Sequence, residues 1–178
     1  PSHPPNDQLS GDARLNADRW EGETEVLSTD LLQDADCVVD AIFGAGLSRD
    51  VDGAAHELID AIGDRYCVAV DVPSGIHGDS GEVMGIAPKV HKTVTFFRLK
   101  PGHLLYPGRA YCGEVVVADI GIPDTVLEEI GPSQWRNGPS GWADEFPWPR
   151  WNDHKYSRGH AIVVGGAEMT GAARLAVQ

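Results

Sequence analysis

The chain has 178 residues, of which 42% are hydrophobic and 23% are charged, and it carries a formal net charge of −13. This length and composition are typical of a soluble protein with one domain of ordinary size and part of a second. The acidic balance disfavours nucleic acids and anionic membranes as main partners, because both carry the same sign of charge, and no apolar run is long enough to span a bilayer.

Two elements are predicted before the central part of the chain. Ser10–Glu21 has the pattern of a helix, with Ser10 as its N-cap and Trp20 on its inner face. Glu23–Leu27 follows as a short predicted strand. Neither element carries a recognisable site motif.

A strand–helix–strand unit comes next. Asp36–Phe43 and Tyr66–Asp71 are short apolar runs typical of strands, and Ala54–Ile62 between them has apolar residues at helical spacing. Such a unit makes the two strands parallel and brings Asp40 and Asp71 to the same carboxyl edge, where open α/β sheets bind ligands. Either aspartate alone could equally cap the following turn. The pair, with glycines beside both, favours a site.

Two more strands and a helix complete this part. Thr93–Leu99 is rich in β-branched and aromatic residues, and Lys100 follows it directly. Glu114–Ile120 is the next predicted strand, and Asp124–Ile130 a short helix. The pattern predicts an α/β fold with a mostly parallel, Rossmann-like sheet and helices on both faces.

The rest of the chain changes character. Residues 132–153 contain four prolines and four tryptophans, which predicts a connection packed on a surface and disfavours a flexible linker. His160–Val164 is a predicted strand, and Thr170–Val177 a predicted helix. Because the first residue is Pro1 and the last helix stops in mid-course, we expect an internal fragment of a longer protein.

Cysteines and histidines give little evidence of a metal site. Cys37 and Cys67 fall in predicted buried strands and no C-x-x-C is present, which favours small core residues in a reducing, cytoplasmic compartment. His77, His91 and His103 show no metal-binding spacing and are predicted to be surface or loop residues.

Four motifs in order now suggest a family. They are Asp40–Leu47, Val70–Ile76, Thr93–Phe96 with Leu99–Gly102, and Asp119–Pro123, and together they resemble the NAD(P)H-hydrate epimerases. The segment from residue 154 to 173 resembles the opening of the ADP-dependent NAD(P)H-hydrate dehydratases, which are ribokinase-like. The two activities occur fused, in this order, in bifunctional repair enzymes. The resemblance implies part of an epimerase domain in residues 1–131, a connector in 132–153, and the first βα unit of a dehydratase domain in 154–178.

The resemblance also implies a substrate and its chemistry. The substrate is hydrated NADH or NADPH, whose R and S forms the epimerase interconverts, while the dehydratase uses ADP to remove water from the S form. Epimerisation through an iminium needs an acid for the departing hydroxyl and a base for the returning water. Asp71 is the candidate catalytic residue. Lys100 is its candidate partner in catalysis. Lys100 could equally form a structural ion pair or contact a phosphate.

A potassium ion and a phosphate-binding loop complete the implied site. Asp40 and Ser74 match the family's potassium ligands, and oxygen donors suit a hard monovalent cation. The loop before the crossover helix, together with Asp71, matches the substrate-binding segment, and its glycines allow close approach of phosphates. The loop residues are Gly44, Ala45, Gly46, Leu47, Ser48, Arg49 and Asp50. A homo-oligomer is left open.

The sequence departs from the family pattern at one point, and two other functions are considered. The family's Asn-Asn-Gly-Gly-Asp-Gly loop, which contributes substrate contacts and one potassium ligand, does not occur in this sequence. A non-catalytic nucleotide- or protein-binding module of the same fold is the main alternative, although paired carboxylates argue against it. An NAD-dependent dehydrogenase is disfavoured, because Gly44-Ala45-Gly46 lacks the third glycine of G-x-G-x-x-G.

Overall fold

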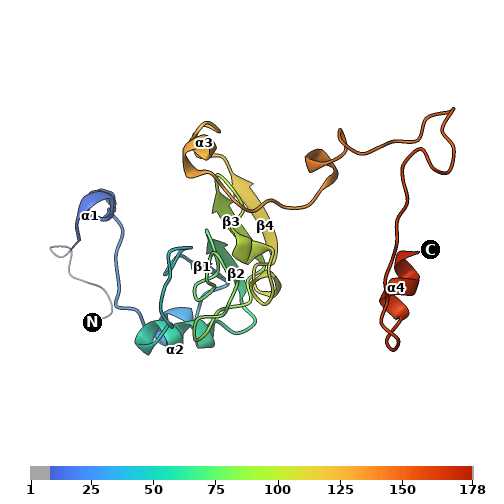
Figure 1. The fold of residues 1–178 in the computed structure, drawn as a ribbon. Coiled ribbons are helices and arrows are strands. Elements are labelled where there is room, and N and C mark those ends of the chain that lie inside the picture. Colours follow the sequence, from blue (N-terminus) through green and yellow to red (C-terminus); the bar gives the residue numbers. More distant parts are fainter. Residues whose placement is uncertain (1–8, 178) are drawn as a thin grey trace. The chain divides into compact units, whose positions relative to one another are not determined.

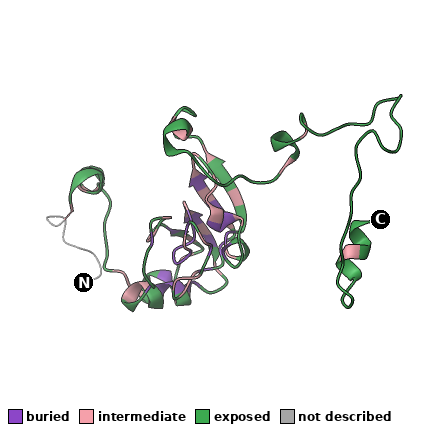
Figure 2. Ribbon diagram, in the orientation of Figure 1, coloured by how far each residue is buried: buried purple, intermediate pink, exposed green. Residues whose placement is uncertain are grey.

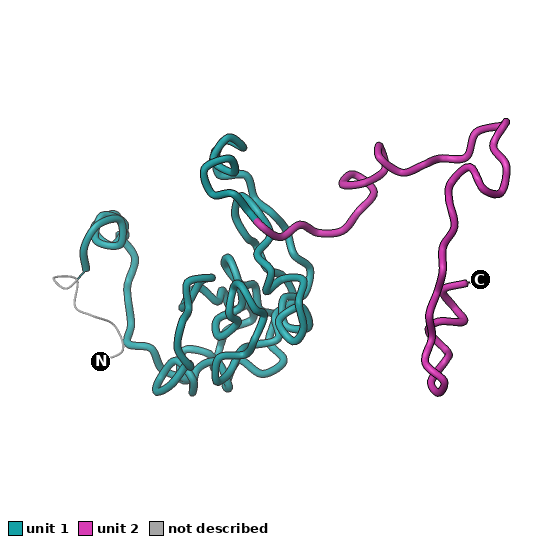
Figure 3. The backbone as a smooth tube through the Cα atoms, in the orientation of Figure 1, with its two compact units in different colours: residues 1–132 teal, residues 133–178 magenta. Residues whose placement is uncertain are grey.

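The computed structural model describes residues 9–177 of the protein. The chain divides into two compact units, residues 1–132 and residues 133–178 (Figure 3). Residues 1–8 of the expected epimerase part and residue 178 lie outside the described residues. None of the described helices is long and apolar enough to cross a membrane.

The first unit is built on a four-stranded sheet (Figure 1). All three strand pairs are parallel, and the strands lie side by side in chain order, which confirms the predicted parallel α/β architecture. The strands are β1 (Cys37–Asp40), β2 (Tyr66–Val70), β3 (Lys92–Phe96) and β4 (Glu114–Ala118). Each begins within one residue of a predicted strand and ends earlier, so the candidate site residues fall in the loops just beyond the strands or, for Asp40, on the last strand residue.

Helix α2 (Gly53–Ile62) is the crossover between β1 and β2 and covers one face of the sheet. Its Leu58 and Ile62 pack with Cys67 and Ala69 of β2, and this cluster forms the main apolar core. Burial raises the pKa of the Cys67 thiol to about 11, so this cysteine is an inert core residue. The predicted strand–helix–strand unit is therefore confirmed, together with the burial of Cys67.

The other face of the sheet is more open within the described residues. Val39 is 65% exposed, and its register partner Val68 is half-buried. Cys37 shares this face with the exposed Tyr66, so the prediction that Cys37 is buried was wrong. The reason is that side chains alternate across a strand, and Cys37 lies on the face that α2 does not cover.

The helices outside the crossover bury no side chains. They are α1 (Gly11–Arg19), α3 (Val126–Ile130) and, in the second unit, α4 (Gly171–Ala176). Each falls within a predicted helix, but Trp20 is exposed and does not lie on an inner face. The expected strand Glu23–Leu27 is absent, because this segment has no strand beside it in the described chain. Short 3₁₀ turns complete the chain at η2 (Thr29–Leu32), η3 (Pro101–His103), η4 (Gly108–Ala110) and η5 (Pro139–Gly141).

The second unit has no buried residue in its described part (Figure 2). The predicted strand His160–Val164 is not formed: Ile162 is 87% exposed, and a strand requires a partner for its backbone groups. The connector tryptophans are also exposed, contrary to the expected packing on a surface. Trp142 and Trp148 instead contact Phe146 between them in tilted arrangements, with ring centroids 5.7 and 4.7 Å from it.

Candidate functional site

Asp71 lies directly after β2, at the carboxyl edge of the sheet. Its backbone adopts a left-handed conformation, with φ of 71°, which is uncommon for a residue with a side chain. Its N–H donates to the carbonyl of Val94 over 2.7 Å, so β3 holds this turn in place. The turn places the carboxylate beside two other segments, the loop after β1 and the loop after β3.

The Asp71 carboxylate accepts hydrogen bonds from both loops. Its Oδ1 accepts from Lys100 Nζ at 2.5 Å and from Thr95 Oγ1 at 3.0 Å. Its Oδ2 accepts from the backbone N–H of Ala45 at 3.1 Å. The structure therefore brings Asp71 together with two segments whose contacting residues, Ala45 and Lys100, lie 26 and 29 residues from it in the sequence.

Lys100 is held by its neighbours in the same way. Besides Asp71, its ammonium group contacts Thr95 Oγ1 at 2.9 Å and the Phe96 carbonyl at 3.2 Å. The ion pair is partly enclosed, with 26% of the lysine side chain and 21% of the aspartate side chain exposed. A well-positioned ion pair that still reaches solvent can exchange protons with a bound molecule.

The charge state of Asp71 results from competing effects. Burial alone would raise the pKa of its carboxyl group, but the hydrogen bonds from Lys100 and Ala45, the lysine charge and the Thr95 hydroxyl outweigh it. The net pKa lies below its ordinary value, so Asp71 is ionised at neutral pH. A depressed aspartate pKa adds stability above pH of about 3.9, the usual value, and this stability disappears as pH falls through the depressed value.

Substitution of Lys100 by methionine is expected to raise the pKa of Asp71. Without the lysine charge and hydrogen bond, only the hydrogen bonds from Ala45 and Thr95 oppose the effect of burial on the pKa of Asp71. The acid-side stability contributed by Asp71 should shrink in the variant for the same reason. Carboxyl ¹³C NMR titration measures the pKa directly. The matched control is Lys92→Met, which removes a surface ion pair with Glu114 and should leave the Asp71 titration unchanged. An unaltered Asp71 pKa in Lys100→Met would contradict the expectation.

Asp40 and Ser74 form a second polar contact, between the end of β1 and the loop after β2. Asp40 is the last residue of β1, and both side chains are buried. Asp40 accepts from the Ser74 hydroxyl at 2.5 Å and from the Ser74 N–H at 2.7 Å. The Phe43 N–H donates to the same hydroxyl at 2.9 Å. Burial raises the pKa of Asp40, although its hydrogen bonds from Ser74 act in the opposite direction.

The oxygen atoms at this contact have the right chemistry for a hard monovalent cation. Asp40, Ser74 and the Phe43 carbonyl, which lies 3.4 Å from the hydroxyl, supply carboxylate, hydroxyl and carbonyl oxygen. Every buried side-chain polar atom in the described residues already has a hydrogen-bond partner, so the contact also links the two loops without an ion. Within the described residues no group of three or more His, Cys, Asp or Glu side chains could hold a metal.

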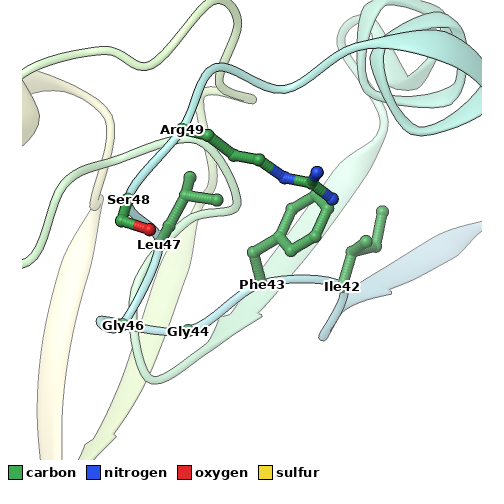
Figure 4. Close-up of a pocket in the computed structure, with 7 residues that line it drawn as sticks. All are labelled: Ile42, Phe43, Gly44, Gly46, Leu47, Ser48 and Arg49. Carbon is green, nitrogen blue, oxygen red and sulfur yellow. The ribbon is translucent and has the colours of Figure 1, made fainter.

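The loop after β1 forms the wall of an open pocket of about 310 Å³ (Figure 4). The Arg49 side chain extends from one end of this loop, and Gly44 and Gly46 near its other end carry no side chain. Leu47 lines the pocket but also belongs to a buried cluster with Val51. Ala45 and Asp50 are not among the lining residues, which are Ile42, Phe43, Gly44, Gly46, Leu47, Ser48 and Arg49.

A second, mainly apolar pocket of about 500 Å³ contains the ion pair itself. Its other residues were not assigned to the site from the sequence, although most of them lie in the family motifs, because their mainly apolar side chains carry no chemistry that would single them out. Arg98 at its edge forms an ion pair of 2.6 Å with Asp124. The lining residues are Asp71, Phe96, Phe97, Arg98, Leu99, Lys100, Pro101, Ile120 and Ile122.

His103 was also misjudged from the sequence. It is not a surface or loop residue: it ends the 3₁₀ turn η3 and is 3% exposed. Its Nδ1 accepts from the Lys100 N–H at 3.0 Å, and its Nε2 lies 2.8 Å from the Asp71 carbonyl oxygen. In the sequence, this contact could have been predicted from the position of His103 three residues after Lys100, in a turn that contains proline and glycine.

A parallel sheet with a glycine loop and a partly enclosed carboxylate–ammonium pair at its carboxyl edge defines a Rossmann-like α/β protein, and this edge is where open α/β sheets bind ligands. Residues 2–102 match the family described as YjeF-related protein N-terminus. The chain belongs to this family.

Curated relatives carry more specific names. The chain is 38% identical over 155 residues to the bifunctional NAD(P)H-hydrate repair enzyme Nnr of Thermofilum pendens, a match that covers 86% of this chain and 28% of the relative. The enzyme of the same name from Coxiella burnetii is also 38% identical over 155 residues, covering 83% of this chain and 31% of the relative. The NAD(P)H-hydrate epimerase of Limosilactobacillus fermentum is 50% identical over 91 residues, covering 50% of this chain and 44% of the relative. The chain thus spans less than half the length of each of these relatives.

Proposed function

We propose that this protein acts in nicotinamide-cofactor repair, as an isomerase that interconverts the R and S hydrates of NADH and NADPH. The observation that carries the proposal is the Asp71–Lys100 pair, enclosed in an apolar pocket beside the glycine loop. The family match over residues 2–102 contains this pair, and relatives named NAD(P)H-hydrate epimerase and bifunctional repair enzyme are similar to this chain, which supports the proposal.

The pair suits the chemistry of epimerisation. The hydrated carbon carries a hydroxyl next to the ring nitrogen, and its configuration inverts if water leaves and another water adds to the opposite face. As the C–O bond breaks, the nitrogen lone pair forms an iminium, and the departing hydroxyl takes a proton from the Lys100 ammonium group. The ionised Asp71 stabilises the cation. When water returns, Asp71 accepts its proton, and proton exchange within the pair restores the starting state.

The two pockets suit the two halves of the substrate. The apolar pocket beside the pair would hold the hydrated ring, with Phe96 and Leu99 in its wall. The loop Gly44–Asp50 would approach the dinucleotide phosphates, because its glycines leave space and the exposed Arg49 supplies positive charge. Potassium, held by Asp40 and Ser74, would supply positive charge that offsets repulsion between Asp40 and Asp71.

We infer a second activity for the whole protein from the rest of the chain. Residues 1–131 would form part of the epimerase domain, 132–153 a connector, and 154–178 the beginning of a dehydratase domain that uses ADP on the S hydrate. The support is that matches to the bifunctional relatives cover 83% to 86% of this chain, more than the first unit alone. The cysteines of the described residues are free, which suits the cytoplasm.

The proposal is tested on the complete gene product, supplied with mixed R and S hydrates and followed by recovery of reduced-nicotinamide absorbance. Recovery of both forms with ADP alone would support two activities in one protein. Recovery of the R form only after addition of a separate S-specific dehydratase would support the epimerase alone. If R-form recovery does not exceed the spontaneous rate even then, with potassium present, the protein is a binding module and the proposal fails.

A further inference from the structure

His103 connects the backbones of the two charged residues at the site. The ring is almost fully buried, and each of its nitrogens contacts one backbone group: the Lys100 N–H on one side and the Asp71 carbonyl on the other. Neither contact involves the reacting carboxylate or ammonium group. The imidazole therefore affects the geometry of the pair through the backbone of the two residues.

The partners determine the form of the ring. Nδ1 accepts a hydrogen bond from an N–H, so it carries no proton, and Nε2 faces a carbonyl oxygen that can only accept, so it carries the proton. Burial lowers the pKa of His103, and the lysine charge acts in the same direction, against the effects of Asp71. A neutral ring with its proton on Nε2 satisfies both contacts at once.

Asp71 requires such support. A residue other than glycine in the left-handed region costs on the order of 1–3 kcal/mol and persists only where its surroundings fix it. The Asp71 N–H is fixed by Val94, and its carbonyl oxygen is fixed by His103. The same ring anchors the Lys100 N–H three residues earlier in the chain, at the start of η3. Both members of the ion pair thus depend on one side chain.

We propose that His103 is a positioning residue, whose neutral imidazole holds the backbones of Asp71 and Lys100 so that their side chains meet in the pocket. The catalytic part of this inference rests on the proposed epimerase function. Displacement of catalytic groups by about 1 Å can reduce a rate on the order of 100-fold. Loss of both contacts is therefore expected to lower kcat while KM for the hydrate changes little, because His103 is not among the residues that line either pocket.

Three substitutions in the complete gene product separate the contacts. His103→Gln retains an N–H near the position of Nε2, His103→Asn retains an acceptor near Nδ1, and His103→Leu retains neither. Because Asp71 needs the Nε2 contact, kcat should fall least in His103→Gln, further in His103→Asn and about 100-fold in His103→Leu. The exposed His56 of α2 provides the matched control, and His56→Gln should keep the wild-type kcat.

A measurement without substrate accompanies the kinetics. Imidazole ¹⁵N NMR of the wild-type protein should show His103 neutral with its proton on Nε2; a charged ring or a proton on Nδ1 would overturn the proposed contacts. A wild-type kcat in folded His103→Leu would overturn the positioning role alone. Absence of epimerisation in the wild-type protein would overturn the proposed function, and with it the kinetic role, while the NMR result would still decide the geometry around Asp71.

Discussion

Replacement of Asp71 by asparagine is expected to reduce epimerisation on the order of 10²- to 10⁴-fold, the usual contribution of a positioned acid–base group. Asparagine tolerates the left-handed backbone that Asp71 adopts and can still accept a hydrogen bond from Lys100. It cannot take a proton from water or stabilise a cation with its charge. The fold should therefore remain and the chemistry should be lost. Asp71→Ala should have the same effect on the rate, with added backbone strain.

The rate is measured as R-form recovery in the complete gene product with excess S-specific dehydratase, so that epimerisation limits the signal. Asp64→Asn is the control, since Asp64 is exposed in the turn after α2 and lies outside both pockets. A chemical denaturation curve for each variant separates loss of chemistry from loss of folding. Wild-type kcat in a folded Asp71→Asn variant would refute the assignment of Asp71 as the base.

Replacement of Asp40 by alanine is expected to lower the free energy of unfolding by about 2–5 kcal/mol. The substitution removes the acceptor of both the Ser74 N–H and the Ser74 hydroxyl, and each buried polar group left without a partner costs about 1–3 kcal/mol. Asp40→Asn should lose less, because its amide oxygen can still accept one of these bonds. Urea denaturation measures the difference. The exposed Asp60 of α2 supplies the control, and Asp60→Ala should change stability by less than about 0.5 kcal/mol.

The pH dependence at Asp40 has the opposite sign to that at Asp71. Because burial raises the pKa of Asp40, the folded state binds its proton more readily than the unfolded state does. The Asp40 contribution to stability therefore falls as pH rises from about 3.9 through the raised value. Potassium gives a separate test of the same residue: KCl, compared with NaCl, should stabilise the wild-type protein and leave Asp40→Ala unaffected. Equal effects of the two salts on both proteins would contradict a potassium ion held by Asp40.

Local patterns were sufficient to predict the sheet of the first unit. The apolar runs that became β1 and β2 are separated by a helix with apolar residues at the right spacing, and this order alone implies parallel pairing. It also implied that Asp40 and Asp71 end at one edge, whereas the direct contact between Asp71 and Lys100 depends on backbone angles and rotamers that the sequence does not state. The left-handed turn at Asp71 is such a case, since only a glycine at this position would have indicated such a turn in the sequence.

The predictions that were wrong share a physical cause. Each depended on the tertiary contacts of a residue, which local sequence patterns do not determine. Cys37 has the neighbours of a core strand residue, but it lies on the sheet face that α2 leaves open. The segment His160–Val164 has the composition of a strand and no strand beside it in the described chain. His103 was predicted to be a surface or loop residue but is buried. Its surroundings include the backbone of a turn far away in the sequence, which apolar periodicity does not indicate.

The left-handed backbone of Asp71 also limits which substitutions this position can accept. Glycine would adopt φ of 71° without steric penalty, whereas another residue there costs on the order of 1–3 kcal/mol. Glycine would also remove the carboxylate that accepts hydrogen bonds from Lys100, Thr95 and Ala45, and this loss opposes the conformational gain. Engineering that raises the melting temperature of this protein should therefore leave position 71 unchanged and seek its gains elsewhere, because removal of this carboxylate would leave the partly enclosed Lys100 ammonium group without its charged partner.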